Sequence, residues 1–293
     1  MAMEGRSGDV FASRKATLVA TAVAVACVGI PFWFWMETWF GKELTEQQIG
    51  EYLADTERPR RAQHALAQIS KRMTAGDESV KVWYPHILDL AGHDLPELRL
   101  TVAWLMGDDP SSGEFHEALR TLVSDPHPMV RRNAALALAR FGDSAGRDEM
   151  RAMLQPYRLA TEHAGVVANR LEPGDAFDAG ALLVRIHQDG EEEPLDVRAP
   201  LPGIVDRQLR ADGDRVAAGD EVTVVRPEST HVLQALAGLY LVGTTEDIDL
   251  VRPYQRQRDG LSTRIPPQAA LTLERIRERM SGQASEADRE DSI

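Results

Sequence analysis

Hydrophobic residues recur at helical spacing over much of this chain, most clearly in the segment 125–143, DPHPMVRRNAALALARFGD. An apolar stripe at intervals of three or four residues is typical of a helix that buries one face. The stripe comprises Val130, Ala134, Leu138 and Phe141. We expect Asp125 to cap this helix, because aspartate accepts the free N–H groups of a first turn, and Gly142 to end it.

The same periodicity predicts further helices, most of them in consecutive pairs. In chain order, the predicted helices span 56–73, 79–90, 95–106, 115–123, 125–143, 146–154, 229–242, 247–257 and 265–280. Repeats start near Asp55, Asp94 and Asp125, which are 39 and 31 residues apart, a spacing typical of stacked helical hairpins. Residues 281–293 are polar and acidic, so we expect a disordered tail there.

Between residues 164 and 225 the pattern changes to short β-branched runs with regularly placed glycines, which predicts strands and turns. The segments 164–186 and 197–225 are two copies of one motif, with Gly-Asp at 174–175 and 213–214. A copy of this length cannot bury its apolar face alone, so we expect the two copies to clasp each other. Turns or close backbone approaches are expected at Gly174, Gly180, Gly203, Gly213 and Gly219.

Residues 16–36 form an uncharged stretch of 21 residues, ATLVATAVAVACVGIPFWFWM, long enough to cross a bilayer as a helix. Arg14 and Lys15 precede it, and tryptophans and phenylalanines cluster at its far end. The positive-inside rule then places residues 1–15 in the cytoplasm, the anchor at 16–40 and all later residues outside.

Two alternatives to an uncleaved anchor remain open. A cleaved signal peptide ends in small residues, whereas this apolar run continues through bulky aromatic residues. A lipoprotein is the other alternative, because Ala24-Val25-Ala26-Cys27 loosely resembles a lipobox. All three versions export the remainder of the chain.

Composition and motifs argue against several classes of function. The net charge of −13 argues against a general nucleic-acid-binding protein, which needs a basic face. The single cysteine excludes an intrachain disulfide. None of the eight histidines falls in an HExxH pattern, and GxSxG, Walker and GxGxxG motifs are absent from the sequence. The sequence therefore predicts a non-catalytic protein without a cofactor or metal site.

Two resemblances indicate the fold class. The order of Asp, Pro, Val-Arg and Ala-Ala in 125–143 resembles a HEAT repeat, which implies an α-α solenoid over 44–156 and 228–280. The stretch VRAPLPGIV and its weaker upstream copy resemble the biotinyl/lipoyl-like barrel-sandwich hybrid, which implies an inserted all-β module at 160–227. Carrier members of that family bear a modified lysine in the connecting hairpin. The corresponding hairpin here, His187–Asp196, has no lysine, which argues against a covalent carrier.

Several residues are candidates for contact with a partner. Arg131 and Arg132 lie outside the apolar stripe, although the arginine after valine in HEAT repeats commonly supports packing between repeats. Trp83, Tyr84 and Trp104 are either core residues or interface anchors. The acidic tip of the hairpin is either a solvated turn or a contact; it comprises Glu191, Glu192 and Glu193.

Together these features predict a mainly α protein with one transmembrane helix. We expect an exported scaffold in the bacterial inner membrane, an accessory or assembly subunit of a membrane protein complex. One alternative is an adaptor of the membrane-fusion type, which usually separates its barrel halves by a long coiled-coil hairpin. The other is an enzyme or cofactor carrier, which the sequence supports least.

Overall fold

The computed structural model describes residues 43–290 and divides the chain into two units, Met1–Ala54 and Asp55–Ile293. The described part of the first unit holds α2 (Glu46–Ala54), which the sequence analysis had not predicted. Thr45 and Gln48 bond reciprocally through backbone and side chain at its start, as in a capping box. The anchor predicted at 16–40 lies outside the described residues. Among the helices that are described, none is both long and apolar enough to span a bilayer.

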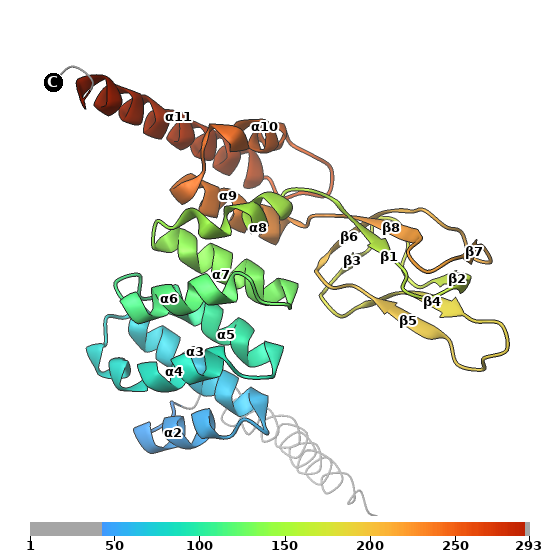
Figure 1. Cartoon of the computed structure of the whole chain (residues 1–293), viewed down its shortest axis with the longest axis horizontal. Helices are drawn as coiled ribbons and strands as arrows, with labels where there is room; N and C mark the ends of the chain where they lie inside the picture. Colours follow the sequence, from blue (N-terminus) through green and yellow to red (C-terminus); the bar gives the residue numbers. More distant parts are fainter. Residues whose placement is uncertain (1–42, 291–293) are drawn as a thin grey trace, which may run out of the picture. The chain divides into compact units, whose positions relative to one another are not determined.

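Paired helices make up the first part of the second unit (Figure 1). They are α3 (Pro59–Thr74), the 3-10 turn η1 (Glu78–Trp83), α4 (Tyr84–Ala91), α5 (Pro96–Met106), α6 (Gly113–Leu122), α7 (Pro128–Arg140), η2 (Ser144–Gly146) and α8 (Arg147–Ala152). α3 packs on α5 and α5 on α7, while α4 packs on α6, so successive pairs stack in two layers. Four of these helices have proline in the first turn, where its missing N–H costs no hydrogen bond.

The expected cap at Asp125 is wrong, because α7 begins at Pro128 with His127 as its N-cap residue. Proline disfavours helical backbone in the residue before it, and His127 is accordingly extended, with φ −85° and ψ 120°. The Asp125 carboxylate instead accepts the His127 N–H at 2.8 Å and two bonds from Arg99, at 2.7 and 3.0 Å. Asp125 therefore joins two repeats rather than capping one helix.

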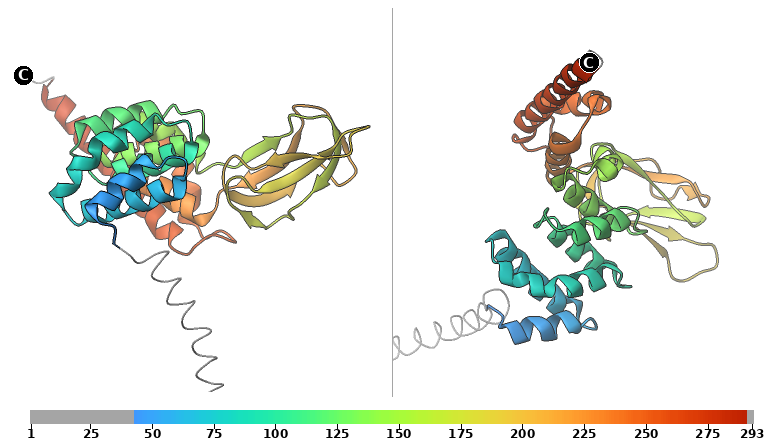
Figure 2. Two further views of the ribbon diagram at one scale, coloured as in Figure 1. Left: turned by 90° about the horizontal axis from the view of Figure 1, so that it is seen from below. Right: turned by 60° about the vertical axis from the view of Figure 1, so that its left-hand side comes forward.

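Eight strands follow the first helices. They are β1 (Tyr157–Ala160), β2 (Gly165–Asn169), β3 (Ala176–Phe177), β4 (Leu182–His187), β5 (Leu195–Arg198), β6 (Gly203–Gln208), β7 (Arg215–Val216) and β8 (Glu221–Arg226). They form two four-stranded antiparallel sheets, in the orders β1-β8-β6-β3 and β5-β4-β2-β7. Side chains from both sheets share one apolar core, so the sheets lie face to face (Figure 2). We call this unit, residues 157–226, the β-module.

The two sequence copies interleave within the β-module. The short strand of each copy joins the sheet built mainly by the other: β3 pairs with β6, and β7 pairs with β2. Equivalent glycines bond across the copies, with Gly174 N–H donating to Val205 O at 2.8 Å and Gly213 N–H to Val167 O at 2.9 Å. Neither copy completes a sheet without the other.

The turn glycines divide into two kinds. Gly174, Gly180, Gly213 and Gly219 have φ between +83° and +102°, a backbone region that favours glycine. Gly203 lies within strand β6 and not in a turn. A Cβ on Gly203 would lie 2.4 Å from Val225 Cγ1, so this glycine permits close packing of β6 against β8.

Helices resume directly after the β-module. They are α9 (Ser229–Val242), η3 (Thr245–Asp247), α10 (Ile248–Val251), η4 (Arg252–Gln255) and α11 (Ile265–Glu290). α11 runs to Glu290, whereas the sequence analysis ended the helix at 280 and expected disorder beyond. The segment 281–290 contains two alanines, two glutamates, one glutamine and one arginine, all residues that favour helix.

The helices before and after the β-module pack together. α9 contacts both α7 and α8, and one core contains Met150 and Leu154 as well as Val232 and Leu239. The Tyr254 hydroxyl donates to Leu154 O at 2.6 Å. The β-module is therefore inserted into the sequence of the helical array, but the helices on either side of the insertion still pack against each other.

Candidate interaction surfaces

An uncovered apolar groove of about 160 Å³ lies on α5, α7 and α9. Its α7 and α9 residues recur at intervals of three and four, so each helix contributes one face. Trp104 and Leu241 line it with 48% and 46% of their surface exposed. The groove lining comprises Trp104, Asn133, Leu136, Ala137, Arg140, Gln234, Ala237, Gly238 and Leu241.

The polar residues of the groove are held in place by the array itself. Asn133 donates to Leu100 O at 3.0 Å. Arg140 donates to Asp108 Oδ1 at 2.8 Å and to Gly107 O at 3.2 Å. No carboxylate lines the groove among the described residues. The arrangement can accept an apolar side chain.

Arg131 bonds within the array. Its Nε donates to Glu149 Oε1 at 2.6 Å, and its Nη1 donates to the carbonyls of Asp125 and Pro126 at 2.9 and 3.1 Å. Arg99 makes the same carbonyl contacts one repeat earlier, with His93 and Asp94. The geometry of Arg131 is that of a residue that packs repeats together.

Arg132 differs from its neighbour because it is buried, with only 6% of its surface exposed. Its Nε has no hydrogen-bond partner within the described chain. Burial lowers the pKa of its guanidinium, and the carboxylate of Glu149 opposes that shift. Arg132 thus lies away from the surface on which the sequence analysis had placed it.

Trp83 and Tyr84 occupy different environments. Trp83 is half-buried, and its ring meets that of His86 edge-on at 5.7 Å. Tyr84 is a core residue whose ring lies 4.3 Å from Phe115 and whose hydroxyl donates to Asp109 at 2.7 Å. Burial raises the pKa of Tyr84, and the bond to Asp109 raises it further. Tyr84 therefore serves packing between repeats.

The hairpin between β4 and β5 presents the acidic side chains found in the sequence. Glu191, Glu192 and Glu193 are all exposed. Asp189 at the same tip pairs with Arg215 at 2.8 Å, which holds the pKa of that carboxyl below its usual value. The structure does not bring this tip together with Arg131, Trp83 or Tyr84 in any recorded contact of the described residues.

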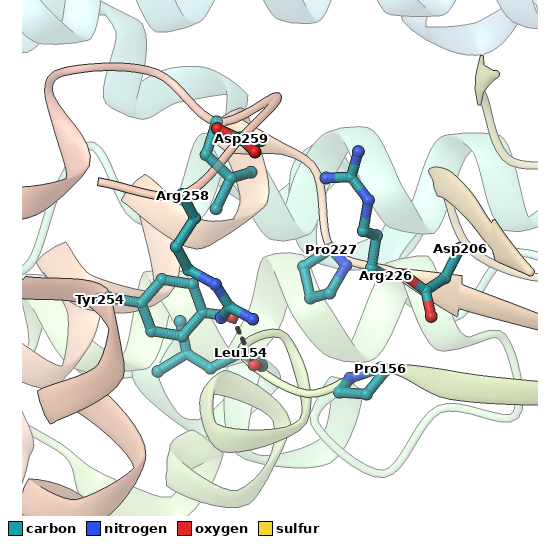
Figure 3. Close-up of a pocket in the computed structure, with 9 residues that line it drawn as sticks. Leu154, Pro156, Asp206, Arg226, Pro227, Tyr254, Arg258 and Asp259 are labelled. Carbon is teal, nitrogen blue, oxygen red and sulfur yellow. Dashed lines mark hydrogen bonds between the residues drawn. The ribbon is translucent and has the colours of Figure 1, made fainter. Parts of the chain in front are cut away.

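A second hollow, a cleft of about 430 Å³, lies between the root of the β-module and the loop after η4 (Figure 3). Arg258 lies over the ring of Tyr254, 5.3 Å from its centroid, and Tyr254 in turn bonds to Leu154. Asp206, Arg226 and Asp259 also line the cleft. Two arginines and two aspartates leave it close to neutral, with prolines and leucines as apolar walls.

The described residues contain no group of three or more His, Cys, Asp or Glu side chains placed to hold a metal ion. The sequence analysis missed Leu241 and left Trp104 as either a core residue or an interface anchor, although its spacing indicates which. Trp104 falls three residues after Thr101 and seven after Glu97, on the polar face of its helix. A tryptophan at such a position indicates an exposed ring.

Comparison with known proteins shows a similarity to helical repeats in part of the chain. Residues 84–167 match the family described as HEAT repeats. A TPR repeat-containing protein of Pseudomonas aeruginosa is 31% identical over 141 residues, which are 46% of this chain and 56% of the relative. The chain thus spans just over half the length of this curated relative. HEAT and TPR units are both stacked helical hairpins, so both similarities support a protein built from helical repeats.

Among solved structures, a single-chain, multi-domain long-chain acyl-CoA carboxylase is similar to 35% of this chain and to 10% of its own chain. The sequence identity is 24% and the TM-score is 0.23. A TM-score of this size is below the level at which a shared fold follows. Proteins built from helical repeats generally bind protein partners through extended surfaces.

Proposed function

We propose that this chain is a protein-interaction scaffold whose partner binds the groove on α5, α7 and α9. One observation carries the proposal: Trp104 and Leu241 are each nearly half exposed beside an uncovered apolar hollow. Tryptophan is enriched among the residues that dominate binding energy in protein interfaces. Burial of both side chains by a partner would remove their apolar surface from water, which favours association.

We also propose that the scaffold is anchored in the bacterial inner membrane and exported. The support is the uncharged run 16–36, the basic pair before it and the aromatic residues after it. In this proposal residues 1–15 are cytoplasmic and the array is periplasmic. The partner is then a membrane-associated complex, and the chain is its accessory or assembly subunit.

The proposal further treats the chain as non-catalytic and the β-module as a barrel-sandwich hybrid. Interleaved copies and equivalent glycine bonds support that kind of module. Because the hairpin His187–Asp196 lacks lysine, the β-module is proposed as a second docking element and not as a carrier. The adaptor alternative has less support, because β4 and β5 are joined by the short loop 188–194 and no long coiled-coil hairpin separates them.

The test is recovery of the tagged full-length chain from native membranes in mild detergent, with mass spectrometry of partners and of the intact chain. We expect a stoichiometric membrane complex with the wild type. Trp104→Ala should reduce recovery of that complex at least tenfold, since truncating a central anchor commonly costs 2 kcal/mol or more, roughly thirtyfold.

Val82→Ala is the matched control, because Val82 is also an exposed apolar side chain, 64% exposed, but lies outside the groove on η1. It should leave recovery unchanged. A chain that purifies alone, or equal recovery with Trp104→Ala and Val82→Ala, would overturn the proposed surface. An intact mass raised by acyl chains on Cys27 would replace the anchor with a lipoprotein.

A further inference from the structure

The cleft between the root of the β-module and the loop after η4 shares no lining residue with the groove on α5, α7 and α9 (Figure 3). Its volume of about 430 Å³ is within the range of pockets that hold small ligands. Leu154 and Tyr254 are its buried residues, whereas Pro156, Pro227 and Leu261 keep part of their surface exposed. The cleft thus offers apolar contact to a ligand beside its four charged side chains.

Arg226, at the end of β8, is the least solvated charge of this cleft. It is half-buried, whereas Asp206, Arg258 and Asp259 are exposed. Its guanidinium packs on Gly260, where an added Cβ would lie 2.9 Å from Nη2 and 3.5 Å from Nη1. Within the described chain its side chain has no hydrogen bond and no ion pair. A guanidinium partly removed from water and without an anion is suited to bind an anionic ligand.

Arg258 provides a second guanidinium from the loop after η4. It lies over the ring of Tyr254, 5.3 Å from the centroid. Stacking on an aromatic ring engages the face of a guanidinium and leaves the N–H groups at its edge available to a ligand. Tyr254 is itself fixed by its hydrogen bond to Leu154 O at 2.6 Å. The array therefore positions this second positive charge at the cleft.

Two carboxylates also line the cleft, but neither forms an ion pair with these arginines in the part of the chain that is described. Asp206 is the extra residue of a β-bulge, where the register of β6 against β8 shifts between Val205 and Arg207. A bulge changes the direction of a side chain, and bulges are frequent beside functional sites. Asp206 and Asp259 are exposed and stay solvated. Their charges repel a doubly charged phosphate more than a singly charged carboxylate.

We propose that this cleft binds a carboxylate joined to an apolar group, with Arg226 as the main anion-binding residue. The planar guanidinium of Arg226 donates two parallel hydrogen bonds to the carboxylate. Pro227 and Leu261 contact the apolar group, and Arg258 adds the second positive charge. The carboxylate belongs to a small molecule or to an acidic side chain of a peptide. The inference does not depend on the proposed function of the groove.

The test is titration of the full-length chain in mild detergent with N-acetyl-leucine, measured by saturation-transfer NMR of the probe. N-acetyl-leucinamide is the uncharged match. We expect the carboxylate to bind roughly tenfold more tightly than the amide, because hydrogen bonds between charged groups are stronger than those of neutral groups.

A blocked peptide separates the two sources of the carboxylate. Tighter binding of acetyl-Leu-Glu-Leu-amide than of acetyl-Leu-Gln-Leu-amide supports an acidic peptide as the ligand. A preference for the charged member with N-acetyl-leucine alone supports a small carboxylate. Equal binding of the charged and uncharged members of both pairs would overturn the proposal.

Variants locate the binding site. Arg226→Met should weaken binding of N-acetyl-leucine roughly tenfold. Asp206→Asn should strengthen it by about two- to fivefold, because the change removes a negative charge from the cleft. Arg207→Met is the matched control and should leave binding unchanged, since Arg207 is an exposed arginine of β6 that does not line the cleft.

The Asp206 side chain forms no hydrogen bond within the described chain, so Asp206→Asn tests the site even if Arg226→Met fails to fold. A thermal melt of each variant checks folding. Unchanged binding in a folded Arg226→Met, or an equal loss in Arg207→Met, would overturn the site. Binding in Asp206→Asn that is no tighter than in the wild type would overturn it as well.

Discussion

At the scale of single residues, Asp125 joins successive repeats from the loop between α6 and α7. Its carboxylate, 6% exposed, accepts two bonds from Arg99 and one from the His127 N–H. Burial raises the pKa of Asp125, but these bonds outweigh it and hold the pKa below its usual value. The ionised carboxylate is therefore the form that stabilises the fold.

The sign of the pH dependence follows from that depressed pKa. The stabilisation is fully present above the ordinary aspartate pKa of about 3.9 and is lost as the pH falls through the lower folded-state value. Arg99→Met should destabilise the chain by roughly 3 to 5 kcal/mol at pH 7, because it leaves Asp125 buried and unpaired. Urea denaturation between pH 7 and 2 measures both effects. An equally steep acid loss in Arg99→Met would contradict the assignment.

The sequence identified Asp125 as important but assigned it the wrong partner. Local spacing predicts bonds within a few residues, whereas Arg99 lies 26 residues earlier and reaches Asp125 only through stacking of α5 on α7. The same limit applies to Arg132. It lies outside the apolar stripe of α7, yet only 6% of its surface is exposed.

At the scale of elements, the β-module shows two ways in which glycine determines a strand arrangement. The turn at Gly213 needs left-handed backbone, at φ +89°, and has open space around it. Gly203 has ordinary backbone but no room for a side chain beside Val225. The sequence repeat predicted that both positions require glycine. It could not show that Gly213 is needed for its backbone conformation and Gly203 for the lack of space beside it.

Substitution distinguishes these two causes. Gly213→Val should lower the stability of the β-module by about 1 to 3 kcal/mol through backbone strain alone. Gly203→Val should cost more, since its Cβ would meet Val225 Cγ1 at 2.4 Å and the strands must separate. Glu192→Lys, on the exposed hairpin, is the control and should leave the melting midpoint unchanged. Thermal melts in the reverse order would show that the turn and tip are wrongly assigned.

At the scale of the whole second unit, the described core shared by α8, α9 and α11 contains no residue of the β-module. Strands β1 and β8 are antiparallel neighbours, with Tyr157 opposite Val225, so the β-module leaves and re-enters the array at adjacent points. Arg147 and Arg151 of α8 approach the buried carboxylate of Asp247 at 3.9 and 3.6 Å, across the interruption in sequence. Helical periodicity on both sides of the β-module predicted that it interrupts the array. The sequence did not predict which helices pack against each other across the interruption.

Excision provides the corresponding prediction. Replacement of residues 157–226 by a short glycine-serine linker between Pro156 and Pro227 should leave a folded array, because paired antiparallel residues lie only about 5 Å apart. We expect far-UV circular dichroism to show the helical signal and a cooperative melt within a few degrees of the intact chain. Loss of cooperative melting in the excised chain would mean that the β-module supports the array.

The place of the β-module between α8 and α9 also imposes an order on synthesis. Leu154 and Val232 share a core, yet they are 78 residues apart in the chain. A ribosome that adds about 5 to 20 residues per second needs about 4 to 15 s to cross that distance. During this interval the earlier repeats have been synthesised, but α8 is not yet packed against α9. Strand β2 is likewise not paired with β7 until residues 215–216 have been made. Newly made chains thus pass through a stage in which the array ends at α8 and exposes Met150 and Leu154 to whatever meets the growing chain first.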